Sequence, residues 1–362
     1  MMALETSPSG AQPLHDKGLS LLDRSPFMLA CRRLPVPYTP IWLMRQAGRY
    51  MPEYRELREK IGFLELCKNP ELACQVTVSA AERLGVDAAI LFADILLVLE
   101  PLGFELAFSR GEGPVIANPL RTVDRVSTLR HVDCGTDLGY VLQTVRMARM
   151  ALPAGLPLIG FSGAPFTLAS YMIEGGASRH FTRTKAFMLQ EPEAWDGLMV
   201  HLSKTVTEYL CAQITNGAQA VQIFDSWVGC LSPGDYRTFV LPHMTRVIAG
   251  LPRGVPVIHF GVGTASLLEL MAQAGSDVMG LDFHVELDEG WRRVGDVAVQ
   301  GNLDPAFLFT DRRSLTARIK RILDQAEGRV GHIFNLGHGV LPTTSVDSVL
   351  ALVEIVHDLS RR

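Results

Sequence analysis

The stretch VPVIHFGVGTASLLELMAQAGS, residues 255–276, decides the fold because it contains one complete structural unit. Its first six residues, VPVIHF, are almost continuously hydrophobic, which is typical of a strand covered on both faces of a parallel sheet. SLLELMAQAGS then places apolar residues at helical spacing and brings a glycine after the helix. We interpret the stretch as a strand, a tight loop and a helix.

The same unit recurs along the chain. The apolar runs that predict strands are IWLM (41–44), AAILFAD (88–94), LPLIGFSG (156–163), AVQIFDS (220–226), VPVIHF (255–260), VMGLDF (278–283), VAVQGNL (297–303) and HIFNLGHG (332–339). Eight strand–helix units predict an α/β protein, a single (β/α)8 TIM barrel. A doubly wound sheet is the alternative, but no G-x-G-x-x-G follows the first strand, and one G-x-G at 261–263 is a weak signal.

Composition narrows the range of functions. The net charge is −4, with 34 Lys and Arg against 38 Asp and Glu, which does not favour binding to nucleic acid or to an anionic membrane. No apolar run approaches the roughly 18 residues of a membrane span, and the N-terminus lacks a signal-peptide layout, so we expect a cytoplasmic protein. We expect residues 1–20 to be a flexible lead-in and 21–362 to form the barrel domain. The six cysteines form no C-x-x-C, so we expect small buried residues and neither disulfides nor structural zinc.

Polar residues gather where the predicted strands end, which is the active-site face of such a barrel. They are Arg45, Asp94, Asp225, Ser226, Asp282, Asn302, Asp304, Asn335 and His338. Ser226 lacks the G-x-S-x-G elbow of a nucleophile, so a hydrogen-bonding role is favoured. His259 lies inside an apolar run and is expected to be a satisfied core histidine.

Arginines cluster in IWLMRQAGRYMPEYRELREK, residues 41–60. A helix over 52–61 would place Arg58 on an inward stripe with Tyr54, Leu57 and Ile61, and would leave Arg55 and Glu59 as a surface pair. Arg45, Arg49 and Arg58 then have two interpretations. They form a structural ion-pair network with local glutamates, or they capture a carboxylate or phosphate, for which the guanidinium fork is well shaped.

Asp94 and His338 carry similar alternatives. Asp94 follows an apolar run, so it either caps a helix or provides a binding anion for cations and N–H donors. Asp304 precedes Pro305 and has the same helix-capping alternative. His338 is flanked by glycines, which favours close approach of the backbone to a ligand.

Six segments together resemble the uroporphyrinogen decarboxylase family from about residue 25 to the C-terminus. They are PIWLMRQAGRYMPEYRELREK, ILFADILLVLEPLG, GFSGAPFTLASYMIEGG, IFDSWVGCLSP, GNLDP and NLGHGVLP. The resemblance implies a single-domain (β/α)8 barrel, usually a cytoplasmic homodimer of haem biosynthesis. It implies a lyase that removes CO2 from the four acetate side chains of uroporphyrinogen, without metal or organic cofactor.

The family's functional positions are then carried over residue by residue. The resemblance implies catalytic roles for Asp94, Arg45, Tyr171 and His338. It implies substrate binding by Arg45, Gln46, Ala47, Arg49, Arg58, Asp94, Tyr171, Ser226 and His338. No metal ligand is implied.

Two rivals remain open. Corrinoid or thiol methyltransferases on a similar barrel hold zinc through a His-x-Cys unit and a later Cys, whereas this chain reads His259-Phe260-Gly261, with no thiolate. The other rival is a non-catalytic tetrapyrrole carrier, which would bind the substrate without releasing CO2.

Overall fold

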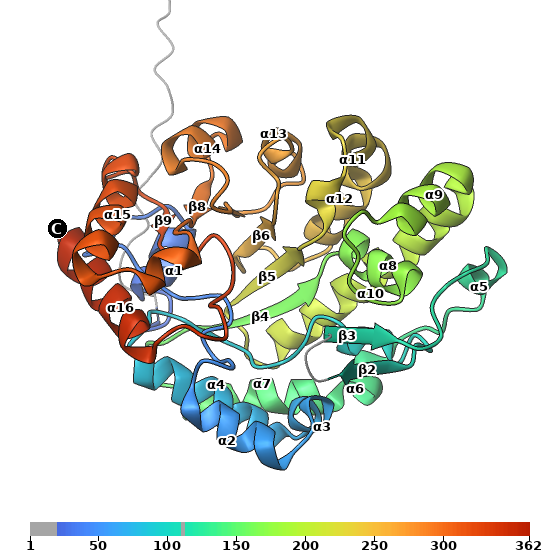
Figure 1. Ribbon diagram of the computed structural model, residues 1–362, viewed down its shortest axis with the longest axis horizontal. Helices are drawn as coiled ribbons and strands as arrows, with labels where there is room; N and C mark the ends of the chain where they lie inside the picture. Colours follow the sequence, from blue (N-terminus) through green and yellow to red (C-terminus); the bar gives the residue numbers. More distant parts are fainter. Residues whose placement is uncertain (1–19, 110–112) are drawn as a thin grey trace, which may run out of the picture.

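The computed structural model describes residues 20–109 and 113–362, so the expected lead-in lies almost wholly outside the described residues. A seven-stranded parallel sheet curls through the centre in the order β1-β4-β5-β6-β7-β8-β9 (Figure 1). Its strands are β1 (Ala89–Ile90), β4 (Leu158–Gly163), β5 (Ala220–Asp225), β6 (Val257–Gly261), β7 (Val278–Gly280), β8 (Ala298–Gln300) and β9 (His332–Ile333). Each lies within one of the predicted runs except β6, which extends one residue beyond the run 255–260. Residues on both faces are buried, as a sheet covered on both sides requires.

The remaining predicted strand, 41–44, is reduced to a single bridge between Ile41 and Phe334. Side chains take two of its backbone N–H groups: Leu43 donates to Gln46 Oε1 at 3.0 Å and Met44 donates to Asn335 Oδ1 at 3.2 Å. These bonds replace a strand ladder, and the chain turns early. The prediction of a full strand was wrong, although the segment occupies the expected place.

Pro40 to Trp42 nevertheless join the two edges of the sheet into a ring. Phe334 N–H donates to the Pro40 carbonyl at 2.8 Å, which attaches the segment to β9. On the other side, Asp87 N–H donates to the Ile41 carbonyl at 2.8 Å, two residues before β1 begins. The segment is therefore position one of an eight-membered ring, followed by β1, β4, β5, β6, β7, β8 and β9 as positions two to eight.

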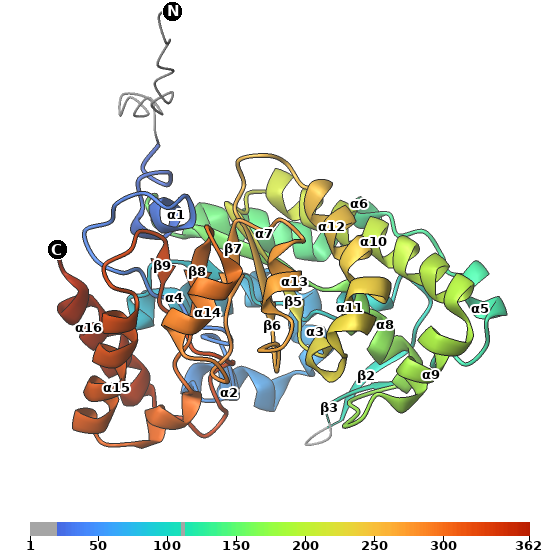
Figure 2. The ribbon, with the colours of Figure 1, turned by 90° about the horizontal axis from the view of Figure 1, so that it is seen from above.

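Helices surround this ring (Figures 1 and 2). They include α1 (Pro26–Cys31), α2 (Pro52–Lys60), α3 (Phe63–Lys68), α4 (Pro70–Leu84), α7 (Gly139–Ala151), α8 (Pro165–Glu174), α9 (Thr182–Gln190), α10 (Pro192–Thr215), α11 (Pro233–Phe239), α12 (Leu241–Ala249), α13 (Leu268–Ala272), α14 (Leu287–Val294), α15 (Arg312–Gln325) and α16 (Val346–Ser360). α4 shows why they begin and end where they do. Asn69 accepts from Leu72 N–H at its start, and Gly85 adopts a left-handed conformation after its end.

A two-stranded antiparallel hairpin was not anticipated from the sequence. It consists of β2 (Leu106–Ser109) and β3 (Gly113–Ile116) and follows β1 in the chain. Ile116 N–H donates to the Gly175 carbonyl at 2.9 Å, so the hairpin lies against the end of α8. Figure 2 shows it at one edge of the molecule. It extends the wall around the ends of the central strands.

One carboxylate fastens ring positions one and two to the C-terminal helix. Asp87 Oδ2 accepts from Ile41 N–H at 2.7 Å and lies 2.8 Å from His357 Nε2, on α16. Asp87 Oδ1 accepts from the Tyr38 hydroxyl at 2.9 Å, and the rings of Tyr38 and His357 meet edge to face at 4.7 Å. Asp87 is buried, so each of these donors replaces water that the carboxylate has lost.

We expect Asp87→Ala to lower the free energy of unfolding by about 3 kcal/mol, because it leaves three buried or half-buried donors without their acceptor. Urea unfolding followed by circular dichroism measures this. Asp324→Ala is the matched control, since Asp324 pairs with Lys320 on an exposed helix face, and we expect a change below about 1 kcal/mol. Equal losses in the two variants would contradict a special role for Asp87.

Candidate active site

The turn after position one, residues 45–50, is braced from inside the protein. Gln46 Nε2 donates to the Ala88 carbonyl at 3.2 Å, and the Tyr50 hydroxyl donates to the Gln46 carbonyl at 2.7 Å. With its Oε1 already bound to Leu43 N–H, the Gln46 side chain is fully buried and satisfied. The side chains of Arg45 and Arg49 are left exposed on the turn, with Ala47 half-buried between them. The geometry gives Gln46 a bracing role, and its substrate contact stays a prediction.

Arg45 lies directly over the loop that follows β9. Val340 N–H donates to the Met44 carbonyl at 2.9 Å, which holds the two segments together. A Cβ at Gly339 would lie 2.5 Å from Arg45 Cδ, so glycine at 339 lets the arginine stem lie where it does, and any other residue would force the stem to shift. Arg45 itself has a φ of 62°, a left-handed conformation that is uncommon for a residue with a side chain. Packing against the loop therefore determines the direction of the guanidinium.

His338 stands in the same loop and is half-buried. Burial lowers the pKa of its imidazole, and the nearby positive charge of Arg45 lowers it further. Its Nδ1 is 3.5 Å from the Gly339 carbonyl, at the limit of a hydrogen bond. Both flanking glycines do lie close to other parts of the protein, Gly337 to the backbone of Phe283 and Gly339 to the stem of Arg45. The approach of a ligand to His338 stays a prediction.

The buried and exposed sides of α2 are those that the sequence predicts. Tyr54 is buried and Arg58 is half-buried, while Glu56 and Lys60 are exposed. Arg58 donates to the Ile61 carbonyl, and its guanidinium lies 5.5 Å from the centre of the Phe63 ring. The predicted Arg55–Glu59 pair was wrong, because Arg55 instead donates to the carbonyls of Arg49 and Tyr50 at 3.2 and 2.9 Å.

The alternative of an ion-pair network finds no support. Within the described chain, none of Arg45, Arg49 and Arg58 forms an ion pair with a carboxylate. Half-buried or exposed guanidinium groups without an internal anion are suited to an anionic ligand.

Asp94 follows β1 by four residues and is only partly exposed. Its Oδ1 accepts from Leu96 N–H at 2.9 Å, which closes the turn before the short 3-10 helix η1 (Leu97–Leu99). The helix-capping alternative was wrong, because the N-cap of η1 is Leu96 and this helix has no side-chain cap bond. Burial raises the pKa of the Asp94 carboxyl to about 6, and the bond from Leu96 N–H and the charge of Arg45 oppose that rise. A desolvated carboxylate that accepts from one backbone N–H can still accept from a ligand.

Tyr171 and Ser226 come from the next two ring positions. Tyr171, on α8, packs against Trp227 with ring centres 5.7 Å apart, and burial together with the charge of Asp94 raises the pKa of its hydroxyl to about 12. Ser226 is the first residue after β5 and is half-buried. Thr167 holds the turn around Ser226 in place. Its hydroxyl donates to Asp225 Oδ1 at 3.2 Å and accepts from Trp227 N–H at 3.4 Å.

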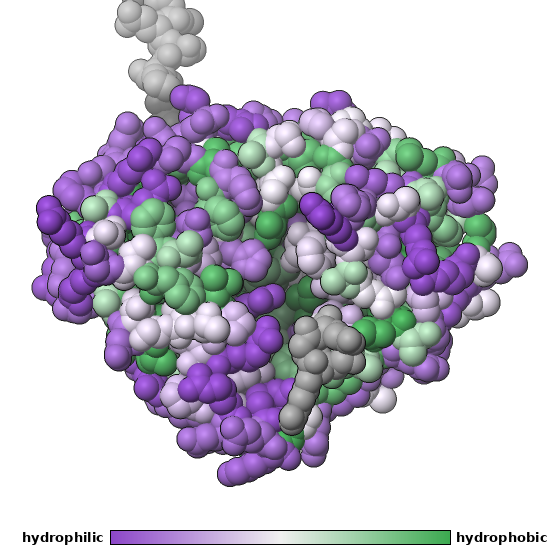
Figure 3. Space-filling view, in the orientation of Figure 1, coloured by the Kyte–Doolittle hydropathy of each residue, from purple (hydrophilic) through white to green (hydrophobic). Residues whose placement is uncertain are grey.

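Several residues around the strand ends were not anticipated. Phe161, Phe224 and Phe260 project from three adjacent strands, with ring centres 5.6 and 6.2 Å apart. Phe224 is the least buried of them. Figure 3 shows a hollow near the centre of this face, with hydrophobic side chains visible inside and hydrophilic ones around its margin. In the sequence, each of these three strands has a phenylalanine near its end. That pattern alone indicates an ordinary core residue, so it did not point to the site.

Other strand-end residues have internal roles. Asp225 and His259 are fully buried, with Asp225 Oδ2 3.5 Å from His259 Nε2. His259 is thus a core residue as expected, although its ring nitrogens lack hydrogen-bond partners in the described chain. Asp304 caps the 3-10 helix η3 (Pro305–Phe309) by accepting from Ala306 N–H. Asn302 donates to the carbonyls of Asp282 and Val285.

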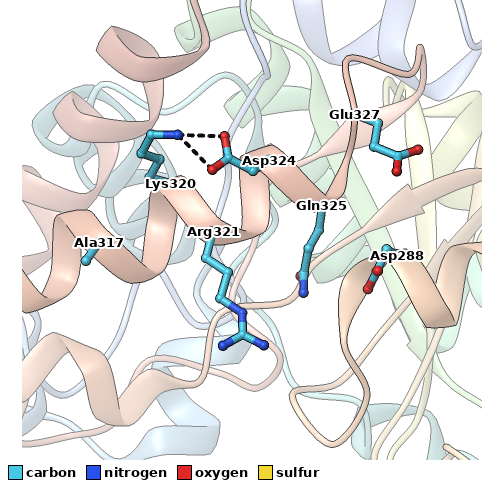
Figure 4. A pocket seen from close by; sticks show the side chains of 7 residues that line it. All are labelled: Asp288, Ala317, Lys320, Arg321, Asp324, Gln325 and Glu327. Carbon is cyan, nitrogen blue, oxygen red and sulfur yellow. Dashed lines mark hydrogen bonds and ion pairs between the residues drawn. The ribbon is translucent and has the colours of Figure 1, made fainter.

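A separate pocket of about 540 Å³ lies on the outer surface between α14 and α15 (Figure 4). Its lining mixes Lys320, Arg321, Asp288 and Asp324, and Lys320 is already paired with Asp324 at 2.7 Å. None of the predicted site residues contributes to it. We therefore place the candidate active site at the strand ends.

Three expectations about metals, cysteines and membranes can be compared with the described residues. All six cysteines are free, and four of them are buried, whereas Cys211 and Cys230 are partly exposed. Among residues 20–109 and 113–362, no three His, Cys, Asp or Glu side chains come together in a way that could hold a metal. No helix of the described chain is long and apolar enough to cross a membrane.

Comparison with known proteins decides the relationship. The model of the family described as uroporphyrinogen decarboxylase (URO-D) matches residues 22–359. The chain belongs to the uroporphyrinogen decarboxylase family. It is 55% identical to the uroporphyrinogen decarboxylase of Carboxydothermus hydrogenoformans over 336 residues, which cover 92% of this chain and 96% of that protein. It is 52% identical to the uroporphyrinogen decarboxylase of a Roseiflexus species over 346 residues, 94% and 99% of the two chains.

Solved structures agree on the fold of this uroporphyrinogen decarboxylase family member. A methyltransferase from Methanosarcina mazei has a TM-score of 0.78 at 18% identity, covering 94% of this chain and 99% of that one. A B12-independent methionine synthase from a Shewanella species has a TM-score of 0.56 at 12% identity, covering 83% and 89%. At identities this low, the two structures support the barrel-type architecture of the chain and give no information about its reaction.

The pKa of Asp94 predicts a stability effect with a definite sign. Since folding raises this pKa from 3.8 to about 6, the contribution of Asp94 to stability is complete below pH 3.8 and is lost as the pH rises through 6. Asn at position 94 can keep the hydrogen bond from Leu96 N–H without the charge. We expect Asp94→Asn to be about 1–3 kcal/mol more stable than the parent at pH 8 and equal to it near pH 4.

Urea unfolding at the two pH values measures the difference. Asp304→Asn is the matched control, because Asp304 accepts a similar hydrogen bond from Ala306 N–H, and we expect no gain there at pH 8. A loss of stability in Asp94→Asn at pH 8 would contradict an opposed charge at this position.

Proposed function

We propose that this protein is a uroporphyrinogen decarboxylase that converts the four acetate side chains of uroporphyrinogen to methyl groups and yields coproporphyrinogen. The observation that carries the proposal is a desolvated carboxylate, Asp94, on which the charge of Arg45 acts, in a chain 52–55% identical to proteins of that name. Arg45, Arg49 and Arg58 form no ion pair with a carboxylate in the described chain. We propose substrate contacts for Arg45, Ala47, Arg49, Arg58, Asp94, Tyr171, Ser226 and His338, with Gln46 contributing through the turn that it braces.

Complementary charge supports these assignments. A porphyrinogen with eight carboxylates needs fixed cations around its edge, and exposed Arg45 and Arg49 with half-buried Arg58 supply them from one short segment. At its centre the macrocycle has four pyrrole N–H donors. Asp94 retains acceptor capacity beyond its bond to Leu96 N–H and can accept from those donors.

The reaction needs an electron sink, and the substrate can supply it. A proton adds to a pyrrole α-carbon and gives a cationic, iminium-like ring. The bond to the carboxylate then breaks, CO2 leaves, and its electron pair neutralises the ring as an exocyclic methylene forms. A proton adds to that methylene and the α-proton departs, which restores the pyrrole with a methyl group. Asp94 would stabilise the cationic stages, and Arg45 would orient the reacting acetate.

Three further assignments accompany this proposal and rest on the resemblance. We propose a homodimer, a cytoplasmic location and one catalytic domain over residues 21–362. Sedimentation at micromolar concentration would show twice the monomer mass of 39.7 kDa if the dimer forms.

The direct test is an anaerobic incubation of the purified protein with reduced uroporphyrinogen, followed by oxidation and separation of the products by carboxylate number. We expect a series from eight carboxylates down to four, unchanged by a chelator. Tight binding without CO2 release would favour a carrier. Neither binding nor turnover would overturn the assignment and make a methyltransferase assay the next step.

We expect Asp94→Ala to reduce kcat by about a hundredfold or more, because it removes the group that stabilises the cation. Circular dichroism must show a folded variant. Asp304→Ala, which removes a capping carboxylate outside the proposed contacts, serves as the control and should keep most of the activity. Near-normal turnover by folded Asp94→Ala would exclude the role of Asp94 as a central anchor.

A further inference from the structure

The proposed contacts occupy only part of the ring. They come from positions one, two, three, four and eight, so positions five to seven, β6 to β8, contribute none. The segments that follow those strands are 262–267, 281–286 and 301–304, and His284 is the one side chain in them that can carry a positive charge. A macrocycle with carboxylates around its whole edge would present some of them to this arc.

His284 is held in a defined orientation by a buried carboxylate. Its Nδ1 lies 2.8 Å from Asp282 Oδ2, and its backbone N–H donates to Asp282 Oδ1 at 3.1 Å. Asp282 also accepts from Gly263 N–H, in the segment after β6. The Asp282 side chain is 1% exposed and that of His284 is 51% exposed, so the pair has an anchored end and an open end.

The protonation of the ring follows from its partner. A carboxylate accepts hydrogen bonds, so Nδ1 carries the proton that points to Asp282. Nε2 is left at the open end, where it has no hydrogen-bond partner among the described residues. When Nε2 is also protonated, the ring can donate to a ligand carboxylate while Nδ1–H stays on Asp282.

The Asp282–His284 pair lies next to His338, which we propose as a substrate contact. A Cβ at Gly337 would lie 2.3 Å from the backbone nitrogen of Phe283, so the loop after β9 touches the loop that carries His284. The charge of Asp282 also acts on the neighbouring His338. His284 and His338 therefore belong to adjoining parts of the same rim.

We propose that His284 is a substrate-contacting residue that binds a peripheral carboxylate of the tetrapyrrole through Nε2, with Asp282 as its positioning residue. The inference rests on the proposed function, because it takes the substrate class from there. It extends the carboxylate-binding rim from the arginine segment to the opposite arc of the ring.

The variant His284→Asn distinguishes the proposed contact of Nε2 with the substrate from the hydrogen bond between Nδ1 and Asp282. Asn places an amide nitrogen where Nδ1 lies, so it can keep the bond to Asp282, but it has nothing in place of Nε2. We expect its KM for uroporphyrinogen to rise about three- to tenfold with kcat within about twofold, and we expect His284→Arg to keep KM within about threefold. An unchanged KM in His284→Asn overturns the proposal, and so does a fall in kcat alone. Thermal unfolding should give both variants the parental melting temperature.

Binding of oxidised uroporphyrin, followed by quenching of tryptophan fluorescence, keeps this test independent of turnover. Parent protein that binds uroporphyrin without releasing CO2 from the reduced substrate would refute the proposed function alone. In that case a three- to tenfold weaker Kd in His284→Asn still supports the contact, and an equal Kd overturns it. Parent protein that neither binds uroporphyrin nor releases CO2 from the reduced substrate would overturn the inference together with its premise. If the parent turns over the reduced substrate without binding uroporphyrin, the KM of His284→Asn decides alone.

Discussion

A single buried carboxylate, Asp87, holds the ring together at its weakest joint. Position one contributes only the Ile41–Phe334 bridge, so little strand pairing is available there. Asp87 compensates by accepting from the backbone of Ile41 and the hydroxyl of Tyr38, and by meeting His357 on the last helix. Arg45 follows Ile41 by four residues. The most basic turn of the candidate site is therefore attached to the joint that these bonds secure.

The electrostatic design is local. A chain with net charge −4 places exposed Arg45 and Arg49 at one rim and leaves them without internal anions. Opposite in sign, Asp94 is held where burial works against its charge. The desolvated carboxylate costs stability in the free protein, and the proposed ligand, with carboxylates outside and N–H donors inside, would satisfy both arrangements. Functional sites commonly carry such local costs.

The sequence predicted the ring and the inward facing of Arg58, because continuous apolar runs and a 3.6-residue stripe are properties of single segments. It could not predict that strand 41–44 would end after one bridge. That outcome depends on Gln46 and Asn335, which are far apart in the chain and accept from two successive backbone N–H groups, those of Leu43 and Met44. The Asp87 contacts could not be predicted for the same reason, since their partners Tyr38 and His357 are brought to Asp87 only by the fold. The Arg55–Glu59 pair failed because nearer carbonyls were available to the arginine.

The contact between Arg45 and Gly339 joins two positions that are almost three hundred residues apart. A side chain at 339 would displace the stem of Arg45 from its present position, and a smaller residue at 45 would remove that reason for glycine at 339. The two positions should therefore tend to change together in related proteins. A lineage that lost the arginine would be free to fill the space beside it, and a bulky residue there would then prevent the arginine from returning.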